Sequence, residues 1–424
     1  MSIEKWILPN GLRVIAVPLR DTKAVTVSIY AKVGSRYETP AINGLSHFIE
    51  HLVFKGTTKR PSTLALTKLL DGVGAQYNAA TSKDWTGFFV KINAEQSELA
   101  FDVLSDLMRN PLFVPKEIDR ERGVILEEIK MYEDNPLMTI EDEFEVTLFG
   151  AHHPLGWLIQ GTSAVIKSVS RRQIIDYRDR FYHAANMRLV IAGALPENYR
   201  DLARQYFGPL KHRSAAPKYR PYKPSAAQPA IKLHHKEMGQ AQVALGVRGL
   251  KYNDPQLPIL SVLSNLLGGT MSSRLFMEVR EKRGLAYFVG SSINPYEDTG
   301  AVELRAGLDK TKLDEALRVM VGELTKLKKV LVPKVELERA KENIRGRTIL
   351  DIEDSDSLAG WYARQSLFHP KMESPDEALA KIKKVTAADI QRLARRLFTP
   401  AAMRLAVIGP YKDVTPWRKI IRSV

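Results

Sequence analysis

The chain of 424 residues contains its own sequence twice, at a nearly constant spacing. Three segments of the first half recur in the same order in the second half: 113–125 (FVPKEIDRERGVI) as 331–344 (LVPKVELERAKENI), 166–170 (IKSVS) as 382–386 (IKKVT), and 186–193 (NMRLVIAG) as 402–409 (AMRLAVIG). The offset between the copies is 216 to 218 residues. Because this unit is far longer than a solenoid repeat, the duplication predicts two homologous domains.

The boundary between the copies is marked by a change in composition. Residues 211–230 read KHRSAAPKYRPYKPSAAQPA, rich in Pro, Ala and basic residues and without apolar periodicity. Such a segment is typical of an exposed linker. We therefore expect an N-terminal domain over residues 1–212, a linker over 213–230 and a homologous C-terminal domain over 231–424.

The order of strand-like and helix-like segments indicates the fold class. Strand patterns open the chain, with a hairpin signal at Asn10-Gly11. Helical patterns follow at residues 44–55, 62–73, 95–110 and 115–134, and strand patterns cover 5–19, 24–35, 75–92 and 187–193. Because strands and blocks of helices are segregated, the sequence favours an α+β fold over a doubly wound α/β sheet.

Composition limits the chemistry and the compartment. The absence of cysteine excludes disulfides, cysteine-ligated zinc, iron–sulfur clusters and thiol nucleophiles, so a metal would have to be held by His, Asp and Glu. No segment approaches the roughly 18 apolar residues of a membrane helix. The first thirty residues lack the pattern of a signal peptide. We expect no membrane span and a cytoplasmic protein, although a cysteine-free chain would also suit a periplasm.

The formal net charge of +15 raises the question of an anionic partner. Nucleic acid and an anionic membrane surface are the general possibilities. No nucleic-acid-binding signature accompanies the charge. We therefore assign it to solvated helix faces and expect no nucleic-acid partner.

The segment HFIEH carries the strongest chemical signal. His47 and His51 are four residues apart, so on a helix both imidazoles share one face and can bind one metal ion. Glu50 is near enough to act on a metal-bound water as a general base. Ser46 and Asn43 are the candidates for the start of this helix.

Two histidines leave a zinc ion without its third protein ligand, which is normally a carboxylate in such sites. Glu121 and Glu128 lie two helical turns apart in ERGVILEEIKMYEDNP and project from the same face. One of them could be the ligand while the other orients a ligating histidine. Taken alone, these residues would be an ordinary charged helix face.

The order H-x-x-E-H is that of the inverzincins, and the chain resembles the pitrilysin and mitochondrial processing peptidase family. The segments GLSHFIEHLVFKGT, ERGVILEEIKMYEDNP, NAATSKDWTGF and RLFMEVREKRGLAYFVGS carry the resemblance over nearly the whole chain. It implies two domains, each a mostly antiparallel sheet with packed helices. It also implies a peptide or unfolded protein substrate and two-domain subunits that pair around a closed chamber, as a homodimer or with a related subunit.

The resemblance also implies roles for single residues. His47, His51 and Glu128 would hold one zinc ion per chain, Glu50 would be the general base and Glu121 the supporting carboxylate, with Glu127 as the substitute for Glu128 if the helix register differs by one. Arg280 and Tyr287, in VREKRGLAY of the second half, would reach the substrate. Without the resemblance, a solvated arginine and a core tyrosine would be expected there. Asn78 and Ala79 would lie beside the bound peptide, unless their strand is internal.

The second half contains no H-x-x-E-H, and an apolar segment, LPILSVLSNLLGG, occupies the place of the metal helix. The remaining histidines have no helix-spaced partner, and Gly268-Gly269 lacks the lysine of a phosphate-binding loop. The sequence thus predicts a zinc-dependent endopeptidase acting on extended peptides. A non-catalytic subunit of a peptidase-like assembly and an anion-binding protein are the alternatives.

Overall fold

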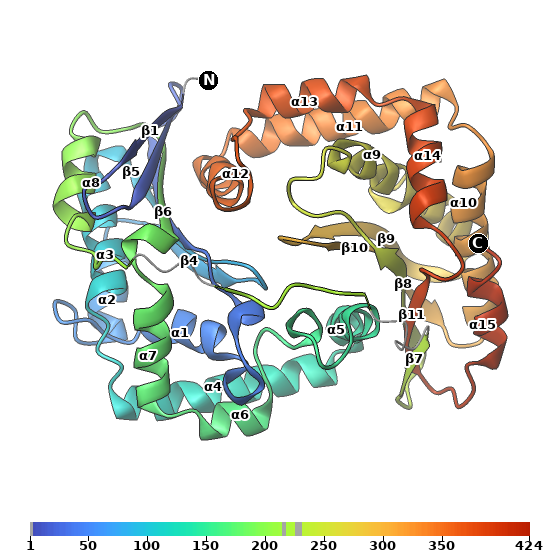
Figure 1. Cartoon of the computed structure of the whole chain (residues 1–424), viewed down its shortest axis with the longest axis horizontal. Helices are drawn as coiled ribbons and strands as arrows, with labels where there is room; N and C mark the ends of the chain where they lie inside the picture. Colours follow the sequence, from blue (N-terminus) through green and yellow to red (C-terminus); the bar gives the residue numbers. More distant parts are fainter. Residues whose placement is uncertain (1–2, 214–217, 225–230) are drawn as a thin grey trace. The chain divides into compact units, whose positions relative to one another are not determined.

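A computed structural model describes residues 3–213, 218–224 and 231–424. The linker expected at 213–230 therefore falls largely outside the described residues. The chain forms two compact units, the first made of Met1–Lys130, Leu158–Arg220 and Ile349–Ser374, and the second of Met131–Trp157, Pro221–Thr348 and Pro375–Val424. Each unit is built on one sheet with its own helices (Figure 1).

The first unit contains a sheet with the strand order β1-β2-β6-β3-β5-β4, six strands within the described residues. Its strands are β1 (Glu4–Ile7), β2 (Arg13–Pro18), β3 (Ala24–Ala31), β4 (Gln76–Thr81), β5 (Thr86–Asn93) and β6 (Met187–Gly193). Only β2 and β6 pair in parallel in this described sheet. The hairpin predicted at Asn10-Gly11 is confirmed as β1 and β2, and the strand segment predicted at 75–92 is the hairpin of β4 and β5.

The second unit contains a sheet with the strand order β7-β11-β8-β10-β9, five strands within the described residues. Its strands are β7 (Ile231–His235), β8 (Gln240–Arg248), β9 (Ala286–Pro295), β10 (Gly300–Asp309) and β11 (Arg404–Gly409). The pair of β7 and β11 is parallel, in the same place as β2 and β6 of the first sheet. The matching order and the matching parallel pair confirm the α+β fold of two homologous, mostly antiparallel sheets.

The helices of the first unit cover its sheet, and one of them, α1, contains the H-x-x-E-H segment. They are α1 (Leu45–Val53), α2 (Thr63–Asp71), α3 (Ser97–Arg109), α4 (Pro115–Asp134), α6 (Ser163–Ser168), α7 (Arg171–Phe181), α8 (Tyr199–Phe207) and α12 (Ser355–Phe368), with short helices η1 (Ser35–Tyr37), η2 (Pro40–Ile42), η3 (Ala94–Gln96) and η5 (Ala184–Asn186). Phe48, Phe88, Phe101 and their apolar neighbours form the core between these helices and the sheet.

The helices of the second unit are α5 (Pro136–Phe149), α9 (Leu257–Gly268), α10 (Leu313–Lys329), α11 (Lys334–Ile352), α13 (Pro375–Lys384), α14 (Ala387–Leu397) and α15 (Thr415–Ile421), with η4 (Pro154–Gly156) and the π-helix η6 (Phe276–Glu281). Its main core lies between the sheet and α9, α10 and α14. A smaller cluster joins α5 to the other face of the sheet through Phe144 and Leu148.

Each unit contains one helix from the other half of the sequence. In the first unit, α12 packs on β3 and β6, and in the second, α5 packs on β8 and β11. The boundaries between the units therefore include one within α4 and one within α11, in addition to one between Arg220 and Pro221 in the linker segment. The sequence boundaries at 212 and 231 remain a prediction about the two copies as folding units. No helix in the described part of the chain combines the length and apolarity needed to cross a bilayer.

Candidate functional site

The H-x-x-E-H segment forms α1, and the start of this helix is fixed from outside it. Gly44 is the N-cap, with a positive φ of 99°, and an added Cβ would lie 2.5 Å from the carbonyl oxygen of Gln160. The buried Glu38 carboxylate accepts hydrogen bonds from the backbone N–H groups of Gly44 and Ser46, both at 2.7 Å. Ser46 and Asn43, expected as caps, do not fill that role, because the Glu38 side chain supplies the missing acceptor.

The predicted metal ligands lie together in the first unit. One ligand atom from each of His47, His51 and Glu128 lies within 4.8 Å of the other two. Glu128 Oε2 is 3.6 Å from His47 Nε2 and 3.7 Å from His51 Nε2. Tetrahedral zinc with ligand bonds of about 2.0–2.2 Å holds its ligand atoms roughly 3.3–3.6 Å apart. The spacing of these three donors therefore fits a zinc ion.

The helix register resolves the alternatives left open among the glutamates of α4. Glu128 and Glu121 face α1, whereas the Glu127 side chain is 74% exposed and pairs with Lys130 at 2.7 Å. Glu121 Oε2 lies 3.3 Å from His51 Nδ1, and its other oxygen lies 2.7 Å from Lys55 Nζ. Glu128 therefore lies where it could complete a cluster with His47 and His51, and Glu121 contacts the other nitrogen of the His51 ring.

Glu50 lies beside the ligands and is held by the sheet. Thr81 Oγ1, at the end of β4, donates a hydrogen bond of 2.5 Å to Glu50 Oε2. Burial raises the pKa of the Glu50 carboxyl, and the hydrogen bond from Thr81 opposes that shift. A raised pKa makes a carboxylate a better proton acceptor near neutral pH, as a general base requires.

The two histidines differ in their electrostatic surroundings. Burial lowers the pKa of His47 to about 3, and the neighbouring His51 adds to this shift. Burial also acts to lower the pKa of His51, but the hydrogen bond to Glu121 and the charges of Glu50 and Glu128 outweigh it and raise the pKa. His47 Nδ1 is buried and has no hydrogen-bond partner among the described residues. The lowered pKa keeps the His47 imidazole neutral, as metal ligation requires, whereas the raised pKa of His51 means that a metal ion would have to displace its proton.

Asn78 and Ala79 lie within β4, at the edge of the first sheet. The alternative of an internal strand does not apply, because β4 pairs only with β5 among the described strands. Asn78 Oδ1 accepts a hydrogen bond from the N–H of Ala79 at 2.8 Å. The same strand carries Thr81, the partner of Glu50, so one strand joins an open sheet edge to the predicted base.

Arg280 and Tyr287 belong to the second unit, where they lie side by side. Arg280 is in the π-helix η6, and its guanidinium is 5.5 Å from the ring centre of Tyr287 on β9. Tyr287 is 79% exposed, so it is not a core aromatic. The pair presents a guanidinium and a phenol on the surface of this unit, both able to donate hydrogen bonds.

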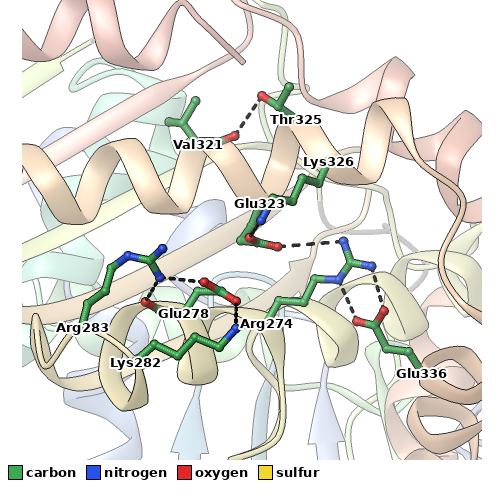
Figure 2. A network of polar contacts seen from close by, with 9 residues as sticks. All are labelled: Arg274, Glu278, Lys282, Arg283, Val321, Glu323, Thr325, Lys326 and Glu336. Atoms are coloured by element: carbon green, nitrogen blue, oxygen red, sulfur yellow. Dashed lines mark hydrogen bonds and ion pairs between the residues drawn. The ribbon is translucent and has the colours of Figure 1, made fainter.

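Ion pairs anchor the helix that carries Arg280, as Figure 2 shows. Glu278 pairs with Lys282 and Arg283, each at 2.6 Å, and hydrogen bonds from these two cations lower the pKa of Glu278 to about 2. The preceding Arg274 makes two hydrogen bonds to Glu336 of α11, at 2.7 and 2.8 Å. This two-point contact ties the start of η6 to a long helix.

Three residues of the site lay outside the sequence prediction: Glu38, Thr81 and Lys55. Thr81 contacts Glu50, Glu38 contacts the backbone just before the motif, and Lys55 contacts Glu121. For Glu38 a signal existed in the sequence, because it is an acidic residue shortly before a helix that lacks its own side-chain cap. Thr81 and Lys55 gave no comparable signal.

Comparisons with known proteins agree with this geometry. The family described as "Insulinase (Peptidase family M16)" matches residues 13–155, and "Peptidase M16 inactive domain" matches residues 168–344. An uncharacterized zinc protease of Streptomyces coelicolor is 35% identical over 97% of this chain and 90% of its own length. An uncharacterized zinc protease of Bacillus subtilis is 33% identical over 96% of this chain and 98% of its own length. The crystal structure of a protease from Helicobacter pylori superposes with a TM-score of 0.91 at 25% identity, covering 96% of this chain and 99% of that one.

Proposed function

This chain belongs to peptidase family M16, and we propose from that membership and from the geometry of its histidine helix that it is a zinc-dependent endopeptidase. The observation that carries the proposal is the cluster of His47, His51 and Glu128, with Glu50 one residue from a ligand. The resemblance to the pitrilysin and processing peptidase family, predicted from the same motif, is confirmed by the comparisons.

His47, His51 and Glu128 would hold one zinc ion per chain. When bound, zinc supplies Lewis acidity, which polarises a peptide carbonyl and makes water more acidic. Three protein ligands leave one coordination position open, as in catalytic rather than structural zinc sites. Glu121 keeps the His51 ring in position through Nδ1, and so fixes which nitrogen faces the cluster.

The proton transfers fall to Glu50. Its carboxylate would take a proton from the attacking water and pass it to the amine that leaves when the peptide bond breaks. The hydrogen bond from Thr81 fixes the orientation of the carboxylate. The buried position of Glu50 keeps bulk water from competing for the proton.

The substrate would be an extended peptide. Strand β4 offers an unpaired edge, within the described sheet, to which a peptide can add by main-chain hydrogen bonds. Asn78 and Ala79 are the proposed contacts on that strand. Arg280 and Tyr287 are proposed to bind the substrate carbonyl groups, since a guanidinium holds a carbonyl and a phenol donates to a developing oxyanion.

We further propose that two chains pair around a closed chamber that admits unfolded segments and excludes folded proteins. Light scattering of the purified protein should give twice the chain mass. A small folded protein with its disulfides intact should resist cleavage, whereas the same protein should be cut after its disulfides are reduced and it unfolds. A monomer with full activity would refute the chamber but leave the zinc chemistry standing.

The decisive experiment replaces Glu50 by Gln, which keeps the size of the side chain and removes the base. Zinc content should stay at one per chain while peptide hydrolysis falls by about 10²–10⁴-fold, the usual contribution of a general base. Glu127→Gln on exposed α4 is the matched control and should be unchanged in both measurements. If Glu50→Gln hydrolyses peptides at the wild-type rate, the mechanism is wrong. If wild-type protein binds zinc but cleaves nothing, the chain is a non-catalytic member of its family.

A further inference from the structure

Two arginines, Arg188 and Arg404, occupy equivalent places in the two copies. Each belongs to the repeated segment, NMRLVIAG or AMRLAVIG, and lies at the start of the strand that this segment forms, β6 or β11. Each donates from Nη1 to two nearby carbonyl oxygens, Arg188 to Ala185 and Met187 and Arg404 to Ala401 and Met403. The Nη1 contacts of the two arginines are therefore equivalent.

The two arginines differ at Nε. In the first copy, Nε of Arg188 donates to the backbone oxygen of Ser366 on α12, at 3.2 Å. In the second copy, Nε of Arg404 is buried and has no hydrogen-bond partner among the described residues. A buried donor left without a partner costs roughly 1–3 kcal/mol, so the second copy contains an unfilled donor where the first has a helix carbonyl.

The space beside the arginine also differs. Arg188 lies opposite Tyr30 on β3, and the Tyr30 side chain is buried under α12. Arg404 lies opposite Gly246 on β8. A cavity of about 230 Å³ lies here in the second unit, lined by Leu148, Arg248, Thr399, Ala401, Ala402 and Arg404. A Cβ added to Gly246 would lie 2.7 Å from the Phe144 ring, so Phe144 takes much of the place that the tyrosine ring has in the first copy. The cavity lined by Arg248 and Arg404 is still large enough for a small ion.

The charge of the cavity is uncompensated. Arg248 is two residues beyond Gly246 on β8, so its side chain leaves the sheet on the same face as that of Arg404. Neither guanidinium has an ion pair with a carboxylate in the described ranges 3–213, 218–224 and 231–424. Burial lowers the pKa of Arg404, and the charge of Arg248 adds to this shift against the opposing effect of Tyr222. Two like charges facing one cavity are stabilised when an anion enters it.

We propose that this cavity is a binding site for a phosphate group, formed by Arg248, Arg404 and Thr399. Arg404, Arg248 and Thr399 line the cavity, and their guanidinium and hydroxyl groups can donate hydrogen bonds to an anion. Phosphate presents oxygens to all three at once, whereas a carboxylate has only two. The site lies within the second unit and does not depend on the proposed peptidase activity.

Isothermal titration calorimetry of the zinc-loaded protein tests the site, with inorganic phosphate, glycerol 2-phosphate and acetate as ligands. We expect one saturable site for phosphate below about 10 mM, and acetate at least tenfold weaker. Glycerol 2-phosphate binding as tightly as phosphate would identify phosphorylated metabolites as ligands, and weaker binding would identify the free ion. Either result supports the phosphate site.

Arg248→Ala is the diagnostic variant, because Arg248 is exposed and packs only over Tyr222 at 5.8 Å. Its phosphate dissociation constant should rise by about tenfold or more. Arg418→Ala removes the same charge from exposed α15 and should change it by less than twofold. Absence of saturable binding in the wild type overturns the proposal. So does equal binding by the two variants, since the phosphate would then be held elsewhere, for example at the metal centre.

Discussion

The helices α1 and α9 occupy the same place in the two copies, but α1 carries ionisable side chains where α9 carries mostly apolar ones. Each follows a central strand, β3 or β8, and packs against the edge strand, β4 or β9. Helix α1 carries His47, Glu50 and His51 among its nine residues, whereas α9 has the sequence LPILSVLSNLLG without histidine or acid. The fold therefore does not require polar residues at this position, and those of α1 serve another purpose.

The long helices α4 and α11 show the same contrast. Helix α4 buries Ile118 and Glu121 three residues apart, and α11 buries Leu337 and Ala340 at the same spacing. A carboxylate on the first helix thus takes the place that alanine takes on the second. Burying a carboxylate is unfavourable unless it is paired, and Glu121 is paired with His51 and Lys55. Polar residues that violate the apolar pattern in only one copy mark the functional copy.

Replacing a histidine of α1 by leucine, the most frequent residue of α9, should have the largest effect on metal binding and activity. His47→Leu is expected to reduce both zinc content and peptide hydrolysis to background, because two ligands cannot replace three. The stability of the metal-free protein should not fall, since the substitution removes a buried imidazole whose Nδ1 lacks a partner among the described residues. Metal analysis, peptide cleavage and thermal unfolding with a chelator measure these quantities.

The control for that experiment is His152→Leu, an exposed histidine outside the cluster. It should keep both zinc and activity. If His47→Leu destabilises the metal-free protein strongly, the imidazole also has a structural role. The comparison of α1 with α9 would then be wrong on that point.

Tyr287→Phe tests whether the second copy contributes chemistry. Loss of one hydrogen-bond donor to a developing oxyanion typically costs about 10²–10³-fold in kcat, so we expect a fall of that size with little change in KM. Tyr287 is exposed, so the fold should be unaffected. Tyr206→Phe is the control: this half-buried tyrosine on α8 of the first unit donates to Glu98, outside the proposed site, and its loss should leave kcat unchanged. An unchanged kcat for Tyr287→Phe would leave the second copy with a structural role only.

The sequence predicted the duplication and the α+β class because each rests on a local pattern. The metal-site residues also rest on a local pattern, and their role stays a prediction. The register of α4, fixed by a spacing of seven residues, places Glu121 and Glu128 on one face, and the structure shows both beside α1. Helix periodicity needs no tertiary information. The same argument turns Glu127 about 100° away from Glu128, and its side chain is exposed in the structure.

The contacts that support the site could not be predicted in the same way. Thr81 reaches Glu50 across 31 positions of the chain, and Lys55 pairs with Glu121 of α4. The exchange of α5 and α12 between the units also has no local signal. Such features depend on which surfaces meet in the folded chain, which a single sequence does not specify.

Glu121→Gln should have an intermediate effect, confined to the metal. The amide keeps the size of the side chain but loses the charge that orients His51, and partners of this kind typically contribute 10–100-fold in metal affinity. We expect the zinc dissociation constant to rise by about that factor, measured by competition with a chromogenic chelator. Glu127→Gln on the same helix is the control. If the two variants bind zinc with equal affinity, Glu121 does not contribute to metal binding, and Glu128 alone distinguishes α4 from α11 in that respect.

The smallest expected effect comes from the other side of the comparison, a buried acid in the second copy. Glu303 on β10 lies opposite Gly246, at the place where Gly87 lies opposite Tyr30 in the first copy. Burial raises the pKa of Glu303 to about 8, and the charges of Glu145 and Asp142 add to the shift. Oxygen Oε1 of Glu303 has no hydrogen-bond partner within the described part of the chain.

A folded-state pKa above the unfolded value means that the folded chain holds this proton more tightly. The stabilisation is fully present below the unfolded pKa, given as 4.5, and is lost as the pH rises through about 8. The free energy of unfolding should therefore fall as the pH rises within this window. Glu303→Gln should flatten that dependence, measured as the urea midpoint at about pH 5 and pH 8 for both proteins. Parallel pH profiles would show that Glu303 is ionised in the folded chain, and that the two copies tolerate buried charge alike.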